Sequence, residues 1–188
     1  VDTGAMYRSI GLYMIKNGID IHDKDAVEKA SEKADVSLKY IDGTQHVILN
    51  GEDVSDQIRT EEVSKAASVV SAYPQVRKNL TALQKKLAES ENVVMDGRDI
   101  GTCVLPNAHL KIYLTPSAEV RGKRRFRDLT AKGAKADLTE IVEDIKKRDE
   151  ADMTREISPL KKADDAVEVD SSDMTMDDVV ARIKGLYD

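Results

Sequence analysis

The chain has 188 residues, of which 40% are hydrophobic and 34% are charged, and its net charge is −6. This length suits one domain with small appended subdomains and is enough to bury a core. An acidic chain argues against a general nucleic-acid binder, whose affinity comes largely from basic surface. The single cysteine, Cys103, excludes an internal disulfide and fits a reducing compartment. With no signal-peptide pattern and no apolar run near 18 residues, we expect a cytoplasmic protein that does not interact with membranes.

The chain opens with helical sequence. Val1 and Asp2 are typical of the end of a strand, and Thr3 is the expected cap of a helix that Gly18 ends. A short second helix is predicted around residues 26–34.

The pattern then changes to short alternating segments. The Asp-Gly pair at 42–43 lies between the strand-like segments 36–41 and 46–49, and an Asn-Gly pair follows at 50–51. Such pairs supply the positive φ angles of tight hairpin turns. This part of the chain therefore predicts a small antiparallel subdomain.

Helical and apolar segments alternate in the remainder. The predicted helices begin at Thr60, Pro74, Pro116, about Leu138 and Thr175, where Thr175 and Asp178 form a capping pair. The predicted strands are 93–95, 110–114 and 166–169. This alternation is typical of a mostly parallel α/β sheet.

The most informative stretch is Asn-Val-Val-Met-Asp-Gly-Arg-Asp-Ile-Gly-Thr at 92–102. It reads as a buried strand that ends in charged residues and glycines. Ligands of open α/β sheets lie beyond the carboxyl ends of parallel strands, so Asp96, Arg98 and Asp99 would lie where an anion and a metal could be held. The alternative is a strand that ends in an ordinary polar turn.

Positive charge is concentrated at one place. Five of the seven residues from Arg121 to Arg127 are Lys or Arg. They form either a solvated helix face or a phosphate site, for which the planar fork of arginine is well suited.

Three segments, in this order and spacing, resemble those of bacterial cytidylate kinases, and the resemblance covers essentially the whole chain. They are Asp-Thr-Gly-Ala-Met-Tyr-Arg at 2–8, Asp-Gly-Arg-Asp-Ile-Gly-Thr at 96–102, and Arg-Asp at 148–149 with Arg-Glu-Ile-Ser-Pro-Leu at 155–160. The resemblance implies an α/β fold, the parallel-sheet core of a nucleoside monophosphate kinase with a small antiparallel insertion and a helical lid. It also implies a monomeric enzyme that transfers the terminal phosphoryl group of ATP, with Mg²⁺, to CMP or dCMP.

The same resemblance implies a division of the chain. The core would comprise residues 1–19, 91–120 and 156–188. A CMP-binding subdomain would occupy 20–90, with the antiparallel insertion near 36–55, and the lid region would occupy 121–155.

The resemblance also implies roles for individual residues. The positions around the monophosphate are matched by Thr3, Arg8 and Arg98. Those that recognise the cytosine ring are matched by Ser68, Arg77 and Asp99, and the group around the ribose and phosphate is matched by Asp152 with Arg148 and Arg155. The alternatives are surface ion pairs for the arginines, and helix capping or packing for Thr3 and Ser68.

The resemblance further implies a catalytic group of four residues: Asp96, Arg98, Arg124 and Arg125. Asp96 would lie near Mg²⁺ and hold it through water, because this ion gives up its hydration reluctantly. Arg121 and Arg124 would contact ATP when the lid closes over it.

One departure from the family pattern is large. No glycine-rich phosphate loop, G-x-x-x-x-G-K-[ST], occurs in these 188 residues. We therefore expect the sequence to be a fragment, or the ordered part of a longer protein, and to be inactive by itself. The alternatives are a non-catalytic CMP-binding or regulatory protein that has lost this loop, and a kinase of broader pyrimidine monophosphate preference. A nucleic-acid module built on residues 121–127 is disfavoured, because the chain as a whole is acidic.

Overall fold

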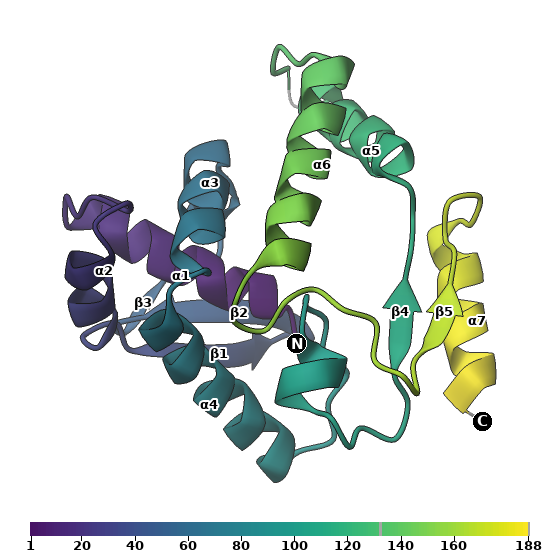
Figure 1. Cartoon of the computed structure of the whole chain (residues 1–188), viewed down its shortest axis with the longest axis horizontal. Coiled ribbons are helices and arrows are strands. Elements are labelled where there is room, and N and C mark those ends of the chain that lie inside the picture. The colour runs from purple at the N-terminus through teal and green to yellow at the C-terminus, as the bar shows by residue number, and fades with distance from the viewer. Residues whose placement is uncertain (132, 188) are drawn as a thin grey trace. The chain divides into compact units, whose positions relative to one another are not determined.

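The computed structural model describes residues 1–131 and 133–187, which divide into two compact units, Val1–Ile100 and a second one from Gly101 (Figure 1). The first unit contains four helices and three short strands among the described residues. In chain order these are α1 (Thr3–Lys16), α2 (Lys24–Ser31), β1 (Val36–Ile41), β2 (Thr44–Leu49), β3 (Glu52–Asp53), α3 (Glu61–Val70) and α4 (Pro74–Ser90).

The first helix begins as predicted, but Thr3 is not its cap. The Asp2 carboxylate accepts a hydrogen bond from the Ala5 amide (2.9 Å), and aspartate is among the preferred N-cap residues. The Thr3 hydroxyl instead donates to the Asp96 carbonyl oxygen (2.6 Å). The prediction of a Thr3 cap was therefore wrong by one residue.

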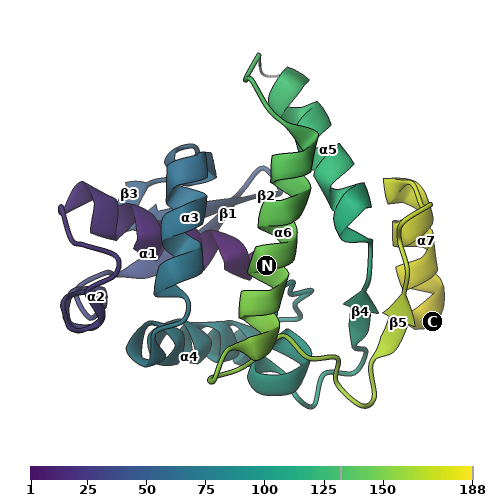
Figure 2. The same cartoon turned by 45° about the horizontal axis from the view of Figure 1, so that its top comes forward.

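The predicted antiparallel strands are confirmed. Strands β1 and β2 pair antiparallel, and Asp42 and Gly43 have φ angles of 51° and 76°, as in a tight hairpin turn (Figure 2). Asn50 and Gly51 also have positive φ angles and lead into β3, which pairs with β2.

The core of the first unit lies where α1 crosses α3. Met6, Ile10 and Met14 of α1 are buried on one face. Beside them lies Gly11, where an added Cβ atom would lie 2.8 Å from the Ala67 backbone nitrogen of α3. The close approach of the two helices therefore depends on a glycine at position 11.

Replacing Gly11 with alanine is expected to lower the free energy of unfolding by about 1–3 kcal/mol, because the backbone of α3 must move. The matched control is Gly185→Ala in the C-terminal helix, where an added Cβ has nothing within 4 Å. There the same substitution is expected to stabilise the protein by roughly 0.4–1 kcal/mol. Thermal unfolding measures both effects, and equal shifts for the two variants would contradict the packing argument.

The predicted buried strand at 93–95 does not form. Asp2 and Asp96 make a single parallel bridge, in which the Asp96 amide donates to the Val1 carbonyl oxygen (3.0 Å). Val94 is 87% exposed. An apolar segment forms a strand only where backbone hydrogen bonds to a neighbouring strand continue along its length. Among the described residues, this segment has only the short bridge to the start of the chain.

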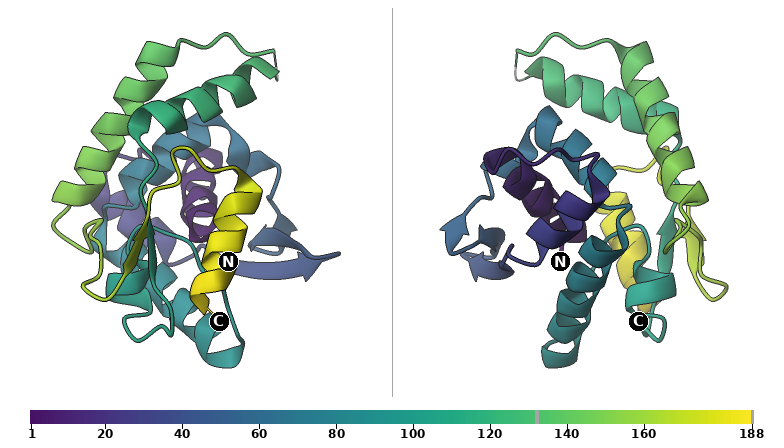
Figure 3. Two further views of the ribbon diagram at one scale, coloured as in Figure 1. Left: turned by 90° about the vertical axis from the view of Figure 1, so that its right-hand side faces the viewer. Right: turned by 60° about the vertical axis from the view of Figure 1, so that its left-hand side comes forward.

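The second unit contains the predicted parallel pair of strands, β4 (Ile112–Leu114) and β5 (Val167–Val169). Helices α5 (Ala118–Ala131) and α6 (Leu138–Thr154) lie side by side (Figure 3). An added Cβ at Gly122 of α5 would overlap the Val142 side chain of α6. Helix α7 (Met176–Tyr187) begins at the predicted capping pair, in which the Asp178 amide donates to the Thr175 hydroxyl (3.2 Å).

A single turn of wide π-helix at Ile100–Val104 was not predicted, nor was a 3₁₀ turn at Gln57–Arg59.

Within the described residues, no helix has both the length and the apolar character needed to cross a membrane.

Candidate functional site

The residues that the sequence singles out fall into both units. Those of the first unit are Thr3, Arg8, Ser68, Arg77, Asp96, Arg98 and Asp99. Those of the second unit are Arg121, Arg124, Arg125, Arg148, Asp152 and Arg155. Each group is built from different elements and is described by itself.

Arg8 is held over the start of its own helix. Its guanidinium pairs with the Asp2 carboxylate (Nη2 to Oδ2, 2.8 Å), and the Nη1 atom lies 3.5 Å from where a Cβ of Gly4 would be. The Nε atom of Arg8 is buried without a hydrogen-bond partner in the part of the chain that the structure describes. Arg8 therefore combines a fixed position with a buried donor that the described residues leave unsatisfied.

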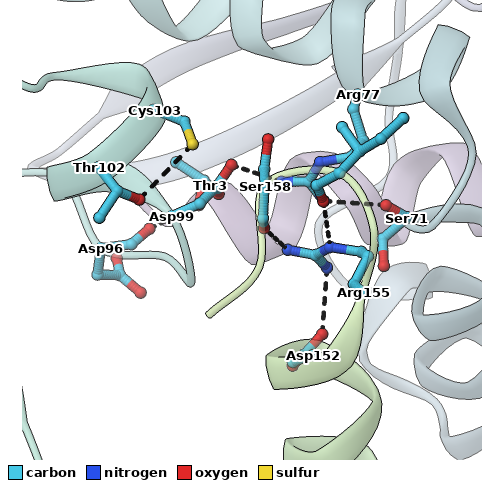
Figure 4. A network of polar contacts seen from close by, with 11 residues as sticks. Thr3, Ser71, Arg77, Asp96, Asp99, Thr102, Cys103, Asp152, Arg155 and Ser158 are labelled. Atoms are coloured by element: carbon cyan, nitrogen blue, oxygen red, sulfur yellow. Dashed lines mark hydrogen bonds and ion pairs between the residues drawn. The ribbon is translucent and has the colours of Figure 1, made fainter. Parts of the chain in front are cut away.

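Arg77 and Asp99 form a buried ion pair (Figure 4). Their side chains are 4% and 5% exposed, and Nη2 of Arg77 lies 2.5 Å from Oδ2 of Asp99. Arg77 also donates to the Ser71 carbonyl oxygen (2.9 Å), and its guanidinium carbon lies 5.4 Å from the centre of the Tyr7 ring. Its Nε atom is buried with no partner among the described residues. A second arginine of this unit thus has a fixed guanidinium and an unused donor.

Ser68 belongs to the same region of the first unit. It lies half-buried on the last turn of α3, and its own carbonyl oxygen accepts a hydrogen bond from the Ser71 hydroxyl (2.9 Å). The Ser71 carbonyl is in turn the acceptor for Arg77. Ser68 and Arg77 are therefore connected through the short turn between α3 and α4.

Asp96 lies at the start of the turn that carries Arg98. Desolvation raises the pKa of the Asp96 carboxyl group above its ordinary value, and the nearby Asp2 carboxylate raises this pKa further. An added Cβ at Gly97 would overlap the Thr3 hydroxyl, so only glycine fits between them. The carboxylates of Asp2 and Asp96 are thus near each other, and the exposed Arg98 follows Asp96 by two residues.

Asp96→Asn is expected to raise the unfolding temperature at pH 7. Because the pKa is raised in the folded state, the folded protein binds more protons than the unfolded chain just above pH 3.8, the ordinary value. The contribution of the Asp96 carboxyl group to stability therefore falls as pH rises from 3.8 through its raised pKa. Asparagine does not titrate, so the variant does not lose this stability. Below the ordinary value the variant and the parent should match.

Calorimetric unfolding temperatures between pH 3 and pH 8 test this, with Asp56→Asn as the control. Asp56 is exposed and its side chain caps no helix. A gain for Asp96→Asn that does not depend on pH would contradict the assignment.

The basic cluster of the second unit is more than a solvated helix face. Arg121 forms a two-pronged pair with Asp149 of α6 (Nη1 to Oδ1, 3.0 Å), which raises the pKa of Arg121. Arg124 donates to the Ser171 carbonyl oxygen (2.9 Å) in the segment after β5. Arg125 is half-buried, whereas Lys123 and Arg127 are exposed. Arg121 and Arg124, which are expected at ATP, thus both have protein partners in this structure.

Asp152 and Arg155 pair at the end of α6. Nη1 of Arg155 lies 3.2 Å from Oδ1 of Asp152, and its Nε donates to the Ile157 carbonyl oxygen (2.8 Å). Ser158, whose carbonyl accepts a further bond from Arg155, has a φ angle of 50°. Arg155 therefore organises the turn that follows α6, with Arg148 two turns earlier on the same helix.

Sequence reasoning missed three residues that hold these arginines. Asp2 and Asp149 are carboxylate partners of Arg8 and Arg121, and the Tyr7 ring lies against Arg77. Asp2 and Tyr7 belong to the 2–8 segment and Asp149 adjoins Arg148, so the motifs contained them without indicating these contacts.

A hollow in the first unit lies apart from the predicted residues. It has a volume of about 220 Å³, and Ile10, Val36, Val76, Leu80 and Leu83 give it a mainly apolar lining. None of the residues predicted for a nucleotide lines this hollow.

Comparison with known proteins gives the family. The family model for cytidylate kinase matches residues 1–188. The cytidylate kinase of Caldicellulosiruptor bescii is 48% identical over 187 residues, which is 100% of this chain and 83% of that protein. Those of Caldanaerobacter subterraneus and Lactobacillus gasseri are 46% and 48% identical over 183 residues, each covering 97% of this chain and 80% of the relative.

The predicted fold class is therefore confirmed: this is the α/β fold of the nucleoside monophosphate kinases. Within that class, the chain belongs to the cytidylate kinase family.

Proposed function

We propose that the protein transfers the terminal phosphoryl group of ATP to CMP or dCMP, giving ADP and CDP or dCDP. The family match over the whole chain supports this reaction. The structural observation that carries it is the pair of arginines, Arg8 and Arg77, each fixed by a carboxylate and each with a buried, unpaired Nε donor. Buried donors need acceptors, and a nucleoside monophosphate supplies them on its phosphate and its base.

In this proposal Arg8 and Arg98 hold the phosphate of CMP. Phosphoryl transfer brings two negatively charged groups together, so the protein must neutralise them and align them. Arg8 enters this task already oriented by Asp2. Arg98 lies exposed in the turn after Asp96, and Thr3 belongs to the same proposed site through its place beside Gly97.

The cytosine ring is recognised by Arg77, Asp99 and Ser68. Cytosine offers an amino donor next to a ring nitrogen and a carbonyl acceptor, which requires both kinds of partner. The carboxylate of Asp99 accepts hydrogen bonds, the guanidinium of Arg77 donates them, and the Ser68 hydroxyl can do either. The ion pair between Arg77 and Asp99 fixes the relative position of donor and acceptor before the base arrives.

The second unit supplies the other charges. Asp152 accepts hydrogen bonds from the ribose hydroxyls, with Arg148 and Arg155 beside the phosphate. Arg121, Arg124 and Arg125 contact ATP, the last two at the transferred phosphate. Because Asp149 and the Ser171 carbonyl hold Arg121 and Arg124 here, closing over ATP requires these arginines to exchange protein partners for phosphate oxygens.

We propose that Mg²⁺ binds near the turn at Asp96. Asp2 and Asp96 are close enough for one to raise the pKa of the other, and a hard cation with oxygen ligands would relieve that repulsion. We propose that Asp96 holds the ion through water, and that the bound ion supplies positive charge to the phosphates. We also propose that the enzyme works as a monomer in the cytoplasm.

The rival proposal is a CMP-binding protein without catalysis. It is favoured by one observation, the absence of G-x-x-x-x-G-K-[ST] from these 188 residues. Turnover of ATP with CMP by the complete gene product would exclude it, whereas tight CMP binding without any ADP release would support it.

CMP is expected to bind to the complete gene product at least tenfold more tightly than UMP or AMP. A site built from buried polar partners rejects a ligand that leaves them unpaired, which costs roughly 1–3 kcal/mol for each group. Titration calorimetry with the three monophosphates measures the preference. Equal affinities for CMP and AMP would overturn the base assignment, and equal affinities for CMP and UMP would favour a broader pyrimidine monophosphate kinase.

A further inference from the structure

We propose that Gln45 is a positioning residue for the monophosphate site, which it serves by holding the backbone of Asp2 and thereby the guanidinium of Arg8. This inference rests on the proposed function, in which Arg8 binds the phosphate of CMP. It gives a role in substrate binding to the antiparallel hairpin, which carries no residue of the expected site.

Gln45 reaches from β2 to the start of α1. Its Oε1 atom accepts a hydrogen bond from the Asp2 amide (2.9 Å), and its Nε2 atom donates to the Asp2 carbonyl oxygen (3.4 Å). The Tyr40 hydroxyl, on the paired strand β1, donates to the same Oε1 atom (3.3 Å). One side-chain amide thus satisfies both backbone groups of Asp2, as a neighbouring strand would.

Asp2 transmits this restraint to the guanidinium. One oxygen of its carboxylate accepts from the Ala5 amide (2.9 Å), and the other pairs with Arg8 (2.8 Å). The Asp2 side chain is 36% exposed, so packing alone does not fix it. Its direction depends on a backbone that is secured by the bridge to Asp96 and by Gln45.

The consequence is specific to the phosphate. If Gln45 is lost, Asp2 and Arg8 gain freedom, while the ion pair between Arg77 and Asp99, which does not include Gln45, is kept. Binding of CMP should weaken, and binding of cytidine, which has no phosphate, should not. A purely structural role for Gln45 would instead lower the fraction of folded protein and weaken both ligands together.

The test is titration calorimetry of CMP and of cytidine on the complete gene product, comparing the parent with Gln45→Met. Methionine has nearly the same length and bulk but cannot replace either hydrogen bond. We expect CMP to bind roughly threefold to tenfold more weakly, the range for one or two neutral hydrogen bonds, with cytidine unchanged. The matched control is Gln57→Met, which removes the 2.8 Å hydrogen bond from Gln57 to Glu52 and nothing at Asp2.

A double-mutant cycle with Arg8→Ala shows whether Gln45 acts through Arg8. We expect Gln45→Met to have no further effect on CMP binding once Arg8 is gone. If Gln45→Met does not fold, Gln45→Asn gives the same comparison, because its amide is one methylene too short to reach both backbone groups.

Three outcomes overturn the inference: an unchanged affinity for CMP in Gln45→Met, an equal loss for CMP and cytidine, or an undiminished effect in the Arg8→Ala background. A parent protein that binds CMP no better than cytidine would instead overturn the proposed phosphate site itself.

Discussion

Arg77→Met is expected to lower the free energy of unfolding by about 3–5 kcal/mol, because it breaks a buried ion pair by removing the guanidinium that contacts Asp99. The same change removes the donor proposed for the cytosine ring, so the preference for CMP over AMP should disappear. Chemical denaturation measures the first effect and titration calorimetry measures the second. An exposed pair provides the control: Lys16→Met, which separates Lys16 from Glu52, should cost less than about 1 kcal/mol.

A second substitution separates stability from recognition. In Arg77→Met/Asp99→Leu the buried charge is gone, and replacing a buried ion pair by apolar residues is often close to neutral. The double variant should therefore recover most of the lost stability without recovering CMP binding. Recovery of both would mean that the pair serves only the fold, and recovery of neither would mean that the cavity around it tolerates no apolar replacement.

The elements that were predicted correctly are those determined by local sequence. The Asp-Gly and Asn-Gly turns need positive φ angles that few other residues accept, and both occur where expected. Helix α4 begins at Pro74 and α7 at its Thr175 pair for similar local reasons. In each case a few adjacent residues decide the outcome.

The strand at 93–95 shows where local sequence is insufficient. Its apolar residues match a buried strand, yet a strand requires neighbours along its length, and Val94 is exposed. The cap of α1 was also misassigned, because Asp2 and Thr3 are both good caps. The choice between them depends on the Asp96 carbonyl oxygen, which accepts a hydrogen bond from the Thr3 hydroxyl. Asp96 is 94 positions away from Asp2 in the sequence.

The candidate site was predicted through motifs, and motifs give positions without partners. The arginines of the 2–8 and 96–102 segments were found in this way. The contact between Arg77 and Asp99 joins residues 22 positions apart, and that between Gln45 and Asp2 joins residues 43 apart. No periodicity in the sequence encodes such pairs, since the folding of separate elements brings them together.

Arg8→Ala is expected to weaken CMP binding tenfold or more, because a charge-assisted hydrogen bond to phosphate contributes about 1.5–3 kcal/mol. Arg98→Ala should have a similar effect. Cytidine binding should change little in either variant, since both residues are assigned to the phosphate. The Asp2 carboxylate that loses its partner in Arg8→Ala is partly exposed, so water can replace the guanidinium and the protein should remain folded.

Two further variants determine whether charge or geometry matters at this position. Arg8→Lys keeps the charge but lacks the planar fork that pairs with Asp2, so it should recover only part of the affinity for CMP. Arg59→Ala removes an exposed arginine of the same unit and should leave both affinities unchanged. If cytidine and CMP lost affinity equally in Arg8→Ala, the arginine would serve the start of α1 rather than the phosphate.

A salt series adds an independent check. The parent's preference for CMP over cytidine should shrink as ionic strength rises, because phosphate binding is electrostatic and partly exposed. In Arg8→Ala the dependence of this preference on ionic strength should be weaker.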